Sequence, residues 1–242
     1  MLRLVTWNIQ LGRRLPVVLQ GLALLPAFDV LTLQELSEHD GTVDAATIAA
    51  HLGPSWRYAQ ATAQTLRGQY QANGFVWDSR RLTVEHVSSI GLPTPSGRML
   101  RLRSSRRNAA VAEVAIDHQR VRLYSVHLDV LGIAHKHAQF AYVLNDAVQR
   151  PPVSVTVVSG DMNTYGIAGR PAWRELRRLA DSAGFEELTM GIGWTHAAGV
   201  RQKLDAVFAS PQGLPHQRRR IILPGSDHIP VWIEISQPPP ST

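Results

Sequence analysis

The feature that most constrains this chain is a strand pattern that ends abruptly in polar residues. Residues Val153–Val158 form a valine-rich run after two prolines, and such a β-branched run is typical of a buried strand. It leads into Ser159-Gly160-Asp161-Met162-Asn163. Glycine permits a turn or a close approach, and ligands of open α/β sheets gather beyond the carboxyl ends of strands. The stretch therefore indicates either a functional strand end or an ordinary Asx-type turn.

Hydrophobic periodicity divides the rest of the chain into further strands and helices. Alternating or apolar runs predict strands over 2–8, 29–35, 56–61, 70–77, 109–116, 121–128, 203–208 and 229–235. Helical spacing predicts helices over 14–25, 42–52, 132–148 and 172–179. No linker or short repeat interrupts this series. We therefore expect one domain over residues 1–236, followed by a disordered, Pro-rich tail over 237–242.

Polar side chains lie at the ends of several of these predicted strands. They are Asn8, Glu35, His127, Asp161 with Asn163, and Asp227 with His228. Each residue alone could serve as a turn former, a solvated acid or a half-buried histidine. Asp205 differs, because it lies inside a predicted strand between apolar neighbours, and a buried carboxylate requires a partner.

The residue types restrict the chemistry that such a site could perform. The chain has no cysteine, which excludes disulfides, zinc-thiolate sites and thiol nucleophiles, and no serine lies in a nucleophile-elbow motif. Carboxylates and amides dominate the set, which favours Mg²⁺ or Mn²⁺ over zinc. Histidines beside carboxylates supply acid–base groups near neutral pH. A hard cation together with His and Asn suits phosphate ester hydrolysis.

In their order along the chain, these motifs resemble those of the endonuclease/exonuclease/phosphatase superfamily, the DNase I-like metal-dependent phosphoesterases. The matching motifs are Thr6-Trp7-Asn8, Leu33-Gln34-Glu35, Val126-His127-Leu128, Gly160-Asp161-Met162-Asn163, Leu204-Asp205 and Ser226-Asp227-His228, with Lys136-x-x-Gln139 and Thr195 as smaller matches. They lie within residues 4–235. The resemblance implies an α/β fold, a four-layer α/β/β/α sandwich of two packed mixed β-sheets with one active site at the sheet ends.

The resemblance also implies roles for these side chains. Glu35 would bind the divalent cation, Mg²⁺ or Mn²⁺, with Asn8 and Asp227 completing or supporting its ligand shell. The catalytic residues would be Asp161 at the attacking water, Asn163 at the phosphoryl group, His228 paired with Asp205, and His127 at the phosphate or the leaving group. His228 would act either as a base or as a donor to the phosphate.

The stretch over residues 70–76 departs from the family pattern. It loosely resembles the Gly-Asn-x-x-x-Ser motif, which makes Asn73 a candidate substrate contact, but it lacks the usual ending. Secreted DNase-like members place a glutamate nearby to pair with the residue equivalent to His127, whereas this chain has Ala72 there. A DNase-like His–Glu pair is therefore not expected. The tyrosine-bearing loop of the apurinic-site repair branch has no recognisable counterpart.

The charge balance favours an anionic partner, with nucleic acid first. The formal net charge is +6, but only Lys136 and Lys203 are lysines, so an arginine-biased composition could also explain it. One segment, residues 98–107, contains Arg98 and the candidate substrate-binding residues Arg101, Arg103, Arg106 and Arg107. In an extended segment, alternate side chains would be spaced about 6–7 Å apart and could follow a row of phosphates. The alternative is a solvated edge.

The leading hypothesis is a nuclease, that is, a metal-dependent phosphodiesterase acting on DNA or RNA. The alternatives are a phosphatase or phosphodiesterase acting on inositol lipids, sphingomyelin or small phosphate esters, and a catalytically inactive binding module, against which the intact motifs argue. The scaffold alone does not choose among them. The sequence has no apolar run long enough for a membrane span and no leader-like N-terminus, so we expect a cytoplasmic monomer.

Overall fold

Strands with apolar residues on both faces build two large sheets in this protein. The computed structural model describes residues 1–66, 69–94, 106–130, 132–166 and 169–236. In these residues the first sheet has the order β13 (His216–Arg220), β14 (Val231–Ile235), β1 (Leu2–Asn8), β2 (Val30–Leu36), β6 (Gln69–Asp78) and β5 (Trp56–Leu66). The second has the order β11 (Glu186–Glu187), β12 (Asp205–Ser210), β10 (Val155–Asp161), β9 (Gln119–His127), β8 (Asn108–Ile116) and β7 (Thr83–Gly91).

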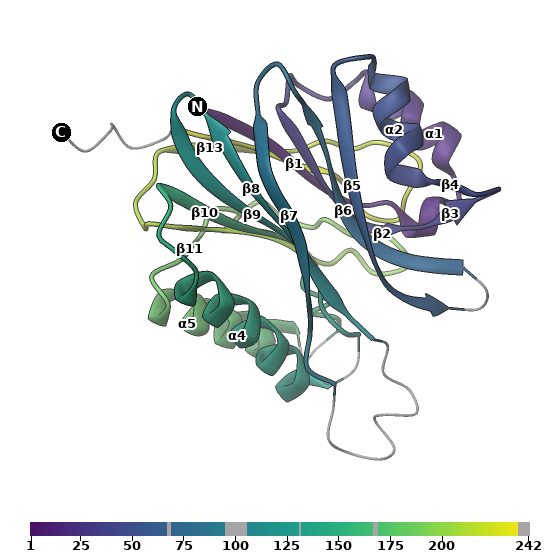
Figure 1. Cartoon of the computed structure of the whole chain (residues 1–242). Helices are drawn as coiled ribbons and strands as arrows, with labels where there is room; N and C mark the ends of the chain where they lie inside the picture. The colour runs from purple at the N-terminus through teal and green to yellow at the C-terminus, as the bar shows by residue number, and fades with distance from the viewer. Residues whose placement is uncertain (67–68, 95–105, 131, 167–168, 237–242) are drawn as a thin grey trace.

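Helices cover the outer face of each sheet, so the chain forms four layers (Figure 1). Helices α1 (Leu15–Leu22) and α2 (Asp44–Leu52) pack on the first sheet. Helices α4 (Ile133–Gln149) and α5 (Gly169–Ser182) pack on the second. A short 3-10 turn (Gln10–Gly12) and a two-stranded ribbon of β3 (Glu38–His39) and β4 (Thr42–Val43) complete the described elements. This arrangement confirms the predicted α/β/β/α sandwich of two mixed sheets.

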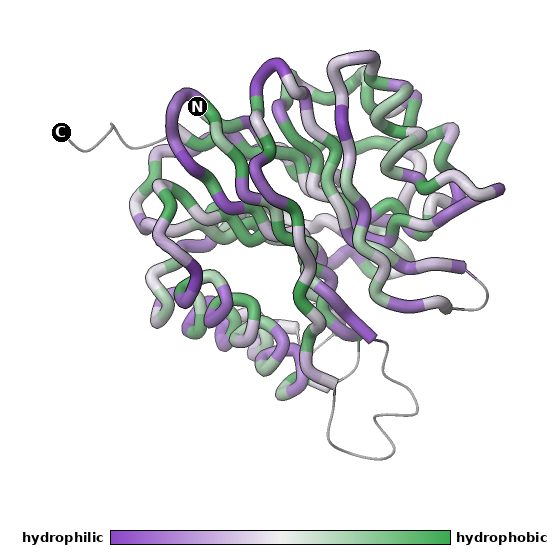
Figure 2. Tube along the Cα trace, in the orientation of Figure 1, coloured by the Kyte–Doolittle hydropathy of each residue, from purple (hydrophilic) through white to green (hydrophobic). Residues whose placement is uncertain are grey.

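One apolar cluster lies under each pair of helices, and a third fills the space between the two sheets. It contains Leu2, Leu4 and Val30 from the first sheet and Val121 and Val157 from the second. Figure 2 shows hydrophobic residues running along the strands between the two helical layers and hydrophilic residues at the turns. Within the described ranges, no helix combines the length and apolar character needed to cross a membrane.

The inward-facing positions of the central strands change from apolar to polar toward one edge of the sandwich. Along β10 the inward series is Val155, Val157, Ser159 and Asp161, and along β9 it is Val121, Leu123, Ser125 and His127. Strands β9 and β10 are parallel to each other, and so are β1 and β2. Because the carboxyl ends of parallel strands meet at the same edge, the strand-end polar residues converge there.

A layer of buried polar side chains separates this edge from the apolar centre. The hydroxyls of Thr32 and Ser159, one from each sheet, lie 2.7 Å apart. Gln34 Nε2 donates to the hydroxyl of Ser125 over 2.9 Å, again between the sheets. All four residues are fully buried. Buried polar groups must be paired, so these bonds fix how the two sheets face each other.

Most predicted elements are present, with shifted boundaries. The strand predicted over 153–158 continues to Asp161, and Asp205 opens β12 instead of lying inside a strand. The helix predicted from residue 42 begins at Asp44, because residues 42–43 pair as β4. Strands β7 and β13 were not predicted. Both are edge strands with many exposed positions, so they lack the apolar pattern of a buried strand. The tail over 237–242 lies outside the described residues.

Gly160 is the one position on β10 that tolerates no side chain. Its φ is 143°, and a Cβ atom built there would lie 1.9 Å from the backbone oxygen of Val126 on β9. The glycine predicted from sequence to permit a close approach therefore does so, next to Asp161.

We predict that Gly160→Ala lowers the free energy of unfolding by about 3 kcal/mol or more, because β9 and β10 must separate as well as accommodate a strained φ. Gly53→Ala is the matched control, since Gly53 has φ 120° but an open Cβ position, and it should cost about 1–2 kcal/mol. Urea denaturation measures both. Equal losses in the two variants would contradict the close-packing explanation.

Candidate active site

The candidate active site lies where the two sheets meet at their polar edge. Asn8, at the end of β1, donates through Nδ2 to Asp161 Oδ2 at the end of β10 over 3.0 Å. His127 Nε2 lies 3.6 Å from the same oxygen and 3.7 Å from Oε1 of Glu35. His228 Nε2 also lies 3.6 Å from Asp161 Oδ2. The structure thus brings together side chains from four separate parts of the sequence around Asp161.

Asp161 is buried and held on both sides. Its Oδ1 accepts a hydrogen bond from the backbone N–H of Asn163 over 2.8 Å, while Asn8 occupies Oδ2. Burial raises the pKa of Asp161 to about 6, although the charge of His228 acts in the opposite direction. The carboxyl group of Asp161 is therefore fixed in orientation, and its pKa lies close to neutral pH.

Asn163 has a positive φ of 51° and is anchored through its backbone and side chain. Its Nδ2 donates to the backbone oxygen of Leu128 over 2.6 Å, and its own backbone oxygen accepts from Nζ of Lys136 over 2.6 Å. Lys136 is buried, and so is Gln139, which accepts from the N–H of Asp129. The Lys136-x-x-Gln139 match from the sequence thus fastens the loops that follow β9 and β10.

Asp205 and His228 form a buried hydrogen-bonded pair, with 2.9 Å between Oδ2 and Nδ1. Burial alone would favour the neutral ring, but the carboxylates of Asp205 and Asp161 raise the pKa of His228 to about 10. Trp7 Nε1 donates to the backbone oxygen of His228. Thr195 Oγ1 accepts from the N–H groups of Leu204 and Asp205. At neutral pH the His228 ring is therefore a positioned, protonated donor.

His127 has the opposite electrostatic character. Burial, together with the positive charges of Arg107 and His228, lowers its pKa well below the usual value. Arg107 Nη1 lies 3.0 Å from Nδ1 and 3.2 Å from Nε2 of this ring, which is neutral and can accept a hydrogen bond. Ala72 is buried in the cluster under α1 and α2 and offers no carboxylate to His127. Arg107 is the partner of His127 instead.

The two described arginines of the predicted flank, Arg106 and Arg107, have different environments. Arg106 is exposed, and its backbone N–H donates to Oε1 of Gln64. Arg107 is only 6% exposed and contacts His127, so the alternative of a solvated edge does not hold for this residue, and its contact with substrate stays a prediction. The adjacent residue, Asn108, starts a buried strand and draws Arg107 inward with it. Arg101 and Arg103 lie outside the described residues.

Oxygen atoms from several elements face one another on the Glu35 side of the site. Glu35 adopts a positive φ of 51° at an irregularity in the pairing of β2 with β6. Burial raises the pKa of Glu35, the charges of Arg107 and His228 oppose this, and Asp227 adds to the rise. Acidic groups held together in this way favour a cation between them.

Carboxylate oxygens are the donors that a hard cation prefers. The closest three-residue groups in the described structure are His196, Asp227 and His228, and Asp161, Asp205 and His228, with ligand atoms within 4.8 Å. Glu35 belongs to neither. Both groups share His228, which already bonds to Asp205, and the predicted ligand set of Glu35, Asn8 and Asp227 stays a prediction.

Three residues near the site were not predicted. Gln10 Nε2 donates to Asp227 Oδ2 over 3.1 Å, and the ring of His196 packs against that of His228 with 4.8 Å between centroids. Tyr165 lies edge-on to His196, and burial with the surrounding carboxylates raises the pKa of its hydroxyl. Each of these three residues comes one or two positions after a motif recognised in the sequence. That proximity was the only sequence signal.

Asn73 lies beside the site instead of at its centre. It is buried on β6, and its Nδ2 donates to the backbone oxygen and to Oδ1 of Asn108 over 2.8 and 2.9 Å. These bonds hold the start of β8 next to Arg107. Contact between Asn73 and substrate stays a prediction.

Comparisons with known proteins agree with this geometry. The family model described as "Endonuclease/Exonuclease/phosphatase family" matches residues 5–228. No curated protein sequence matches the chain. Among solved structures, an endonuclease/exonuclease/phosphatase from Bacteroides vulgatus has a TM-score of 0.76 at 15% identity, with 98% of this chain and 99% of that chain covered.

Two further structures are of a protein with bound DNA and of a phosphatase. TDP2 from D. rerio, complexed with a single-strand DNA product, has a TM-score of 0.68 at 18% identity, with 96% of this chain and 98% of that chain covered. A mannosyl-6-phosphatase from Bacteroides thetaiotaomicron has a TM-score of 0.71 at 12% identity, with 98% and 100% covered. These likenesses establish the fold. With the family match over residues 5–228, they show that this chain belongs to the endonuclease/exonuclease/phosphatase family of metal-dependent phosphoesterases.

Proposed function

We propose that this protein is a divalent-metal-dependent phosphodiester hydrolase that cleaves nucleic acid. The observation that carries the hydrolytic part is the convergence on Asp161 of an oxygen-ligand group on one side and the Asp205–His228 pair on the other. Hydrolysis of a phosphate ester requires two things: charge must be neutralised at the phosphate, and a proton must be removed from the attacking water.

Glu35, with Asn8 and Asp227, would hold Mg²⁺ or Mn²⁺. When bound, such a cation neutralises charge on the phosphoryl oxygens. Gln10 orients Asp227 through its Nε2 and Asn8 through its backbone N–H, which donates to Asn8 Oδ1 over 3.0 Å. The ligand residues of β1 and of the loop before β14 are thereby fixed relative to each other.

The remaining side chains would act on water and on the phosphate. Asp161 is held by Asn8 and by the N–H of Asn163, so its carboxylate can orient the attacking water and receive its proton. His228 would donate to a phosphoryl oxygen, since Asp205 fixes its Nδ1 and leaves Nε2 directed toward the site. His127 and Arg107 would contact the phosphate from β9 and β8, and Asn163 would contact it beside Asp161.

Charge favours a polynucleotide as the substrate. The net charge is +6, and Arg107 places a buried cation against the catalytic histidine. The fold alone does not decide, because solved relatives include a protein bound to single-strand DNA and a sugar phosphatase. Activity on a panel of single- and double-stranded DNA, RNA, a lipid phosphodiester and a phosphomonoester would test the assignment. Preference for the lipid or the monoester would contradict it.

We predict that Glu35→Gln lowers the rate of phosphodiester hydrolysis by about a thousandfold or more, because the cation that stabilises transition-state charge loses its main ligand. Excess EDTA should abolish the wild-type activity, and Mg²⁺ or Mn²⁺ should restore it. Circular dichroism should show an unchanged fold. Glu38→Gln, three residues along the chain on β3, is the matched control and should retain activity. Full turnover in EDTA would disprove the metal requirement.

We further predict that Asp205→Asn and His228→Ala are non-additive. The carboxylate holds the imidazole in position, so removing either should cost about a thousandfold in kcat, and removing both should cost little more. Single-turnover hydrolysis of a chromogenic phosphodiester measures all four proteins of the cycle. A double variant that loses the product of the two single losses would show that the residues act independently.

A further inference from the structure

A tryptophan that contacts two arginines lies beside the candidate active site. The guanidinium carbons of Arg201 and Arg220 each lie 4.6 Å from the ring centroid of Trp194. Arg220 Nη1 also donates to the backbone oxygen of Trp194 over 2.9 Å. Gly193 makes this approach possible, because a Cβ there would lie 3.2 Å from Arg220 Nη1. We call Trp194, Arg201 and Arg220 the Trp194 cluster.

The Trp194 cluster is attached to the segment that carries the catalytic residues. His196, two residues after Trp194, packs on His228 with 4.8 Å between ring centroids. The backbone N–H of Ile229 donates to the oxygen of Thr195 over 2.7 Å. Arg220 ends β13 opposite Val231, the first residue of β14, so it lies at the end of β13 nearer to the site. The Trp194 cluster therefore lies next to His196, on the side of the candidate site where β13 ends and β14 begins.

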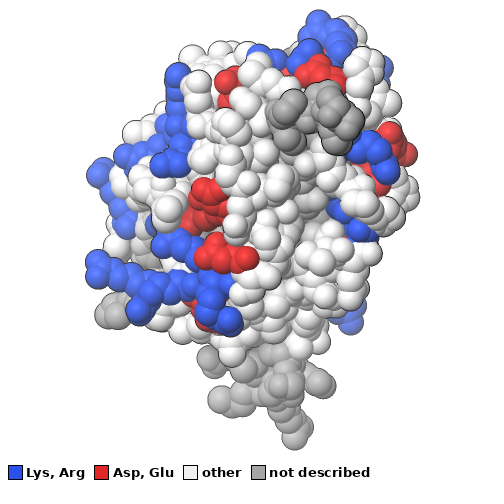
Figure 3. Space-filling view, turned by 90° about the vertical axis from the view of Figure 1, so that its left-hand side faces the viewer, with Lys and Arg blue, Asp and Glu red and all other residues white. Residues whose placement is uncertain are grey.

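The arginines of the cluster have no acidic partner in the described structure. Neither Arg201 nor Arg220 forms an ion pair there, and the same holds for Arg218 and Arg219 on β13. Figure 3, which views the side of the molecule with the sheet edges β11 and β13, shows Lys and Arg gathered along its left-hand border. Two guanidinium groups beside one ring carry like charges, and an anion bound near both would offset their repulsion.

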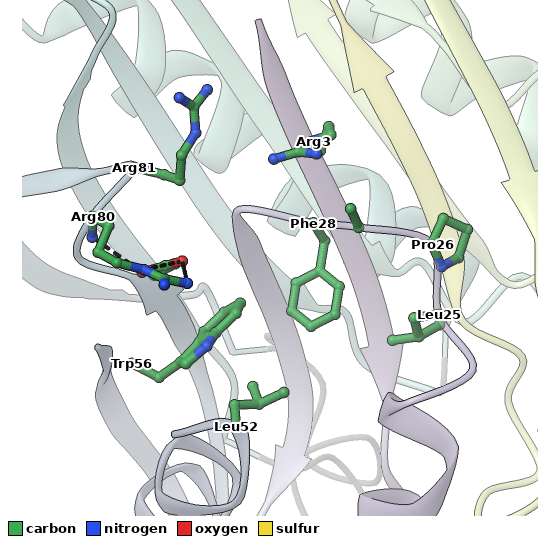
Figure 4. Close-up of a pocket in the computed structure, with 10 residues that line it drawn as sticks. Arg3, Leu25, Pro26, Phe28, Leu52, Trp56, Arg80 and Arg81 are labelled. Carbon is green, nitrogen blue, oxygen red and sulfur yellow. Dashed lines mark hydrogen bonds and ion pairs between the residues drawn. The ribbon is translucent and has the colours of Figure 1, made fainter. Parts of the chain in front are cut away.

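A cavity at the other end of the first sheet provides the contrast. It is lined by Phe28 and Trp56, whose rings are tilted by 53° with 5.1 Å between centroids, and by Arg3, Arg80 and Arg81 (Figure 4). There the arginines are neutralised. Arg80 pairs with Asp78 over 2.7 Å, and Arg3 and Arg81 pair with Asp29. The arginines that line this cavity with Phe28 and Trp56 are therefore paired with carboxylates, whereas those of the Trp194 cluster are not.

We propose that the Trp194 cluster binds the phosphate backbone of a polynucleotide next to the scissile phosphate, on the His196 side of the site. This rests on the proposed nuclease function. Planar guanidinium groups bind phosphate through paired hydrogen bonds, and stacking on Trp194 holds them in place before the substrate arrives. Arg218 lies on the same face of β13 as Arg220, about 6–7 Å away, within reach of the next phosphate. A small phosphate ester does not extend to these residues.

The test compares Arg201→Gln/Arg220→Gln with Arg80→Gln/Arg81→Gln, which changes the net charge equally at the distant cavity. Binding of a labelled 12-nucleotide DNA is measured by fluorescence anisotropy in EDTA at several salt concentrations, so that no cleavage occurs. The cluster variant should bind about tenfold more weakly for each arginine removed, with a salt slope reduced by about 1 for each. The cavity variant should bind like the wild type. Hydrolysis of bis(p-nitrophenyl) phosphate with Mn²⁺ should be unchanged in both.

Each other outcome has a separate meaning. Equal weakening in both double variants would reduce the effect to net charge and overturn the proposal. A matching loss of chromogenic ester hydrolysis in the cluster variant would assign the cluster to support of the active site and overturn it as well. So would weaker binding to anionic phosphatidylserine vesicles with unchanged DNA binding. By contrast, a wild type that binds DNA through the cluster but hydrolyses only the small ester would disprove the nuclease function and leave the binding surface supported.

Discussion

The hydrogen bond from Asn8 to Asp161 is the interaction on which the candidate site depends, because it joins the two sheets at the point where the chemistry would occur. Behind it, the Thr32–Ser159 and Gln34–Ser125 contacts form a buried polar layer that the apolar centre of the sandwich cannot replace. A shift of one sheet past the other would leave these groups unpaired in the interior, at a cost of about 1–3 kcal/mol for each group. The register between the sheets, and hence the geometry of the site, is fixed by polar complementarity as much as by apolar packing.

Two histidines that lie 3.6 Å from the same oxygen of Asp161 have opposite protonation preferences. His228 bonds to Asp205 and faces Asp161, so carboxylates overcome the effect of burial and favour the charged ring. His127 is equally buried but contacts Arg107, so burial and a neighbouring cation both favour the neutral ring. The site can therefore hold one charged and one neutral imidazole beside the same carboxylate, that of Asp161. The difference comes from neighbours on other strands, since the residue type is the same.

The net positive charge of the protein indicates an anionic partner only where arginines are not already paired with carboxylates. Around the distant cavity, Asp29 and Asp78 neutralise the guanidinium groups, and these arginines stabilise the surface. Arg107 is buried against His127, and Arg201 and Arg220 contact the ring of Trp194 with no carboxylate partner in the described part of the chain. A formal charge of +6 is thus an average over paired and unpaired groups. Arginines without a carboxylate partner, such as Arg201 and Arg220 among the described residues, are the ones available to an anionic polymer.

The sequence by itself determined the strands of the sandwich interior and the residues at their ends. Apolar runs and period-two alternation are local properties, so they predicted β1, β2, β9 and β10, with Asn8, Glu35, His127 and Asp161 at the strand ends, and the family resemblance implied that these ends share one site. The edge strands β7 and β13 escaped prediction because exposed strands need no apolar alternation. Contacts between distant segments were decided by tertiary structure alone: the inward turn of Arg107, the packing of His196 on His228, and the stacking of Arg201 and Arg220 on Trp194. Such contacts depend on how two sheets and their connecting loops pack, and no spacing along the chain encodes that geometry.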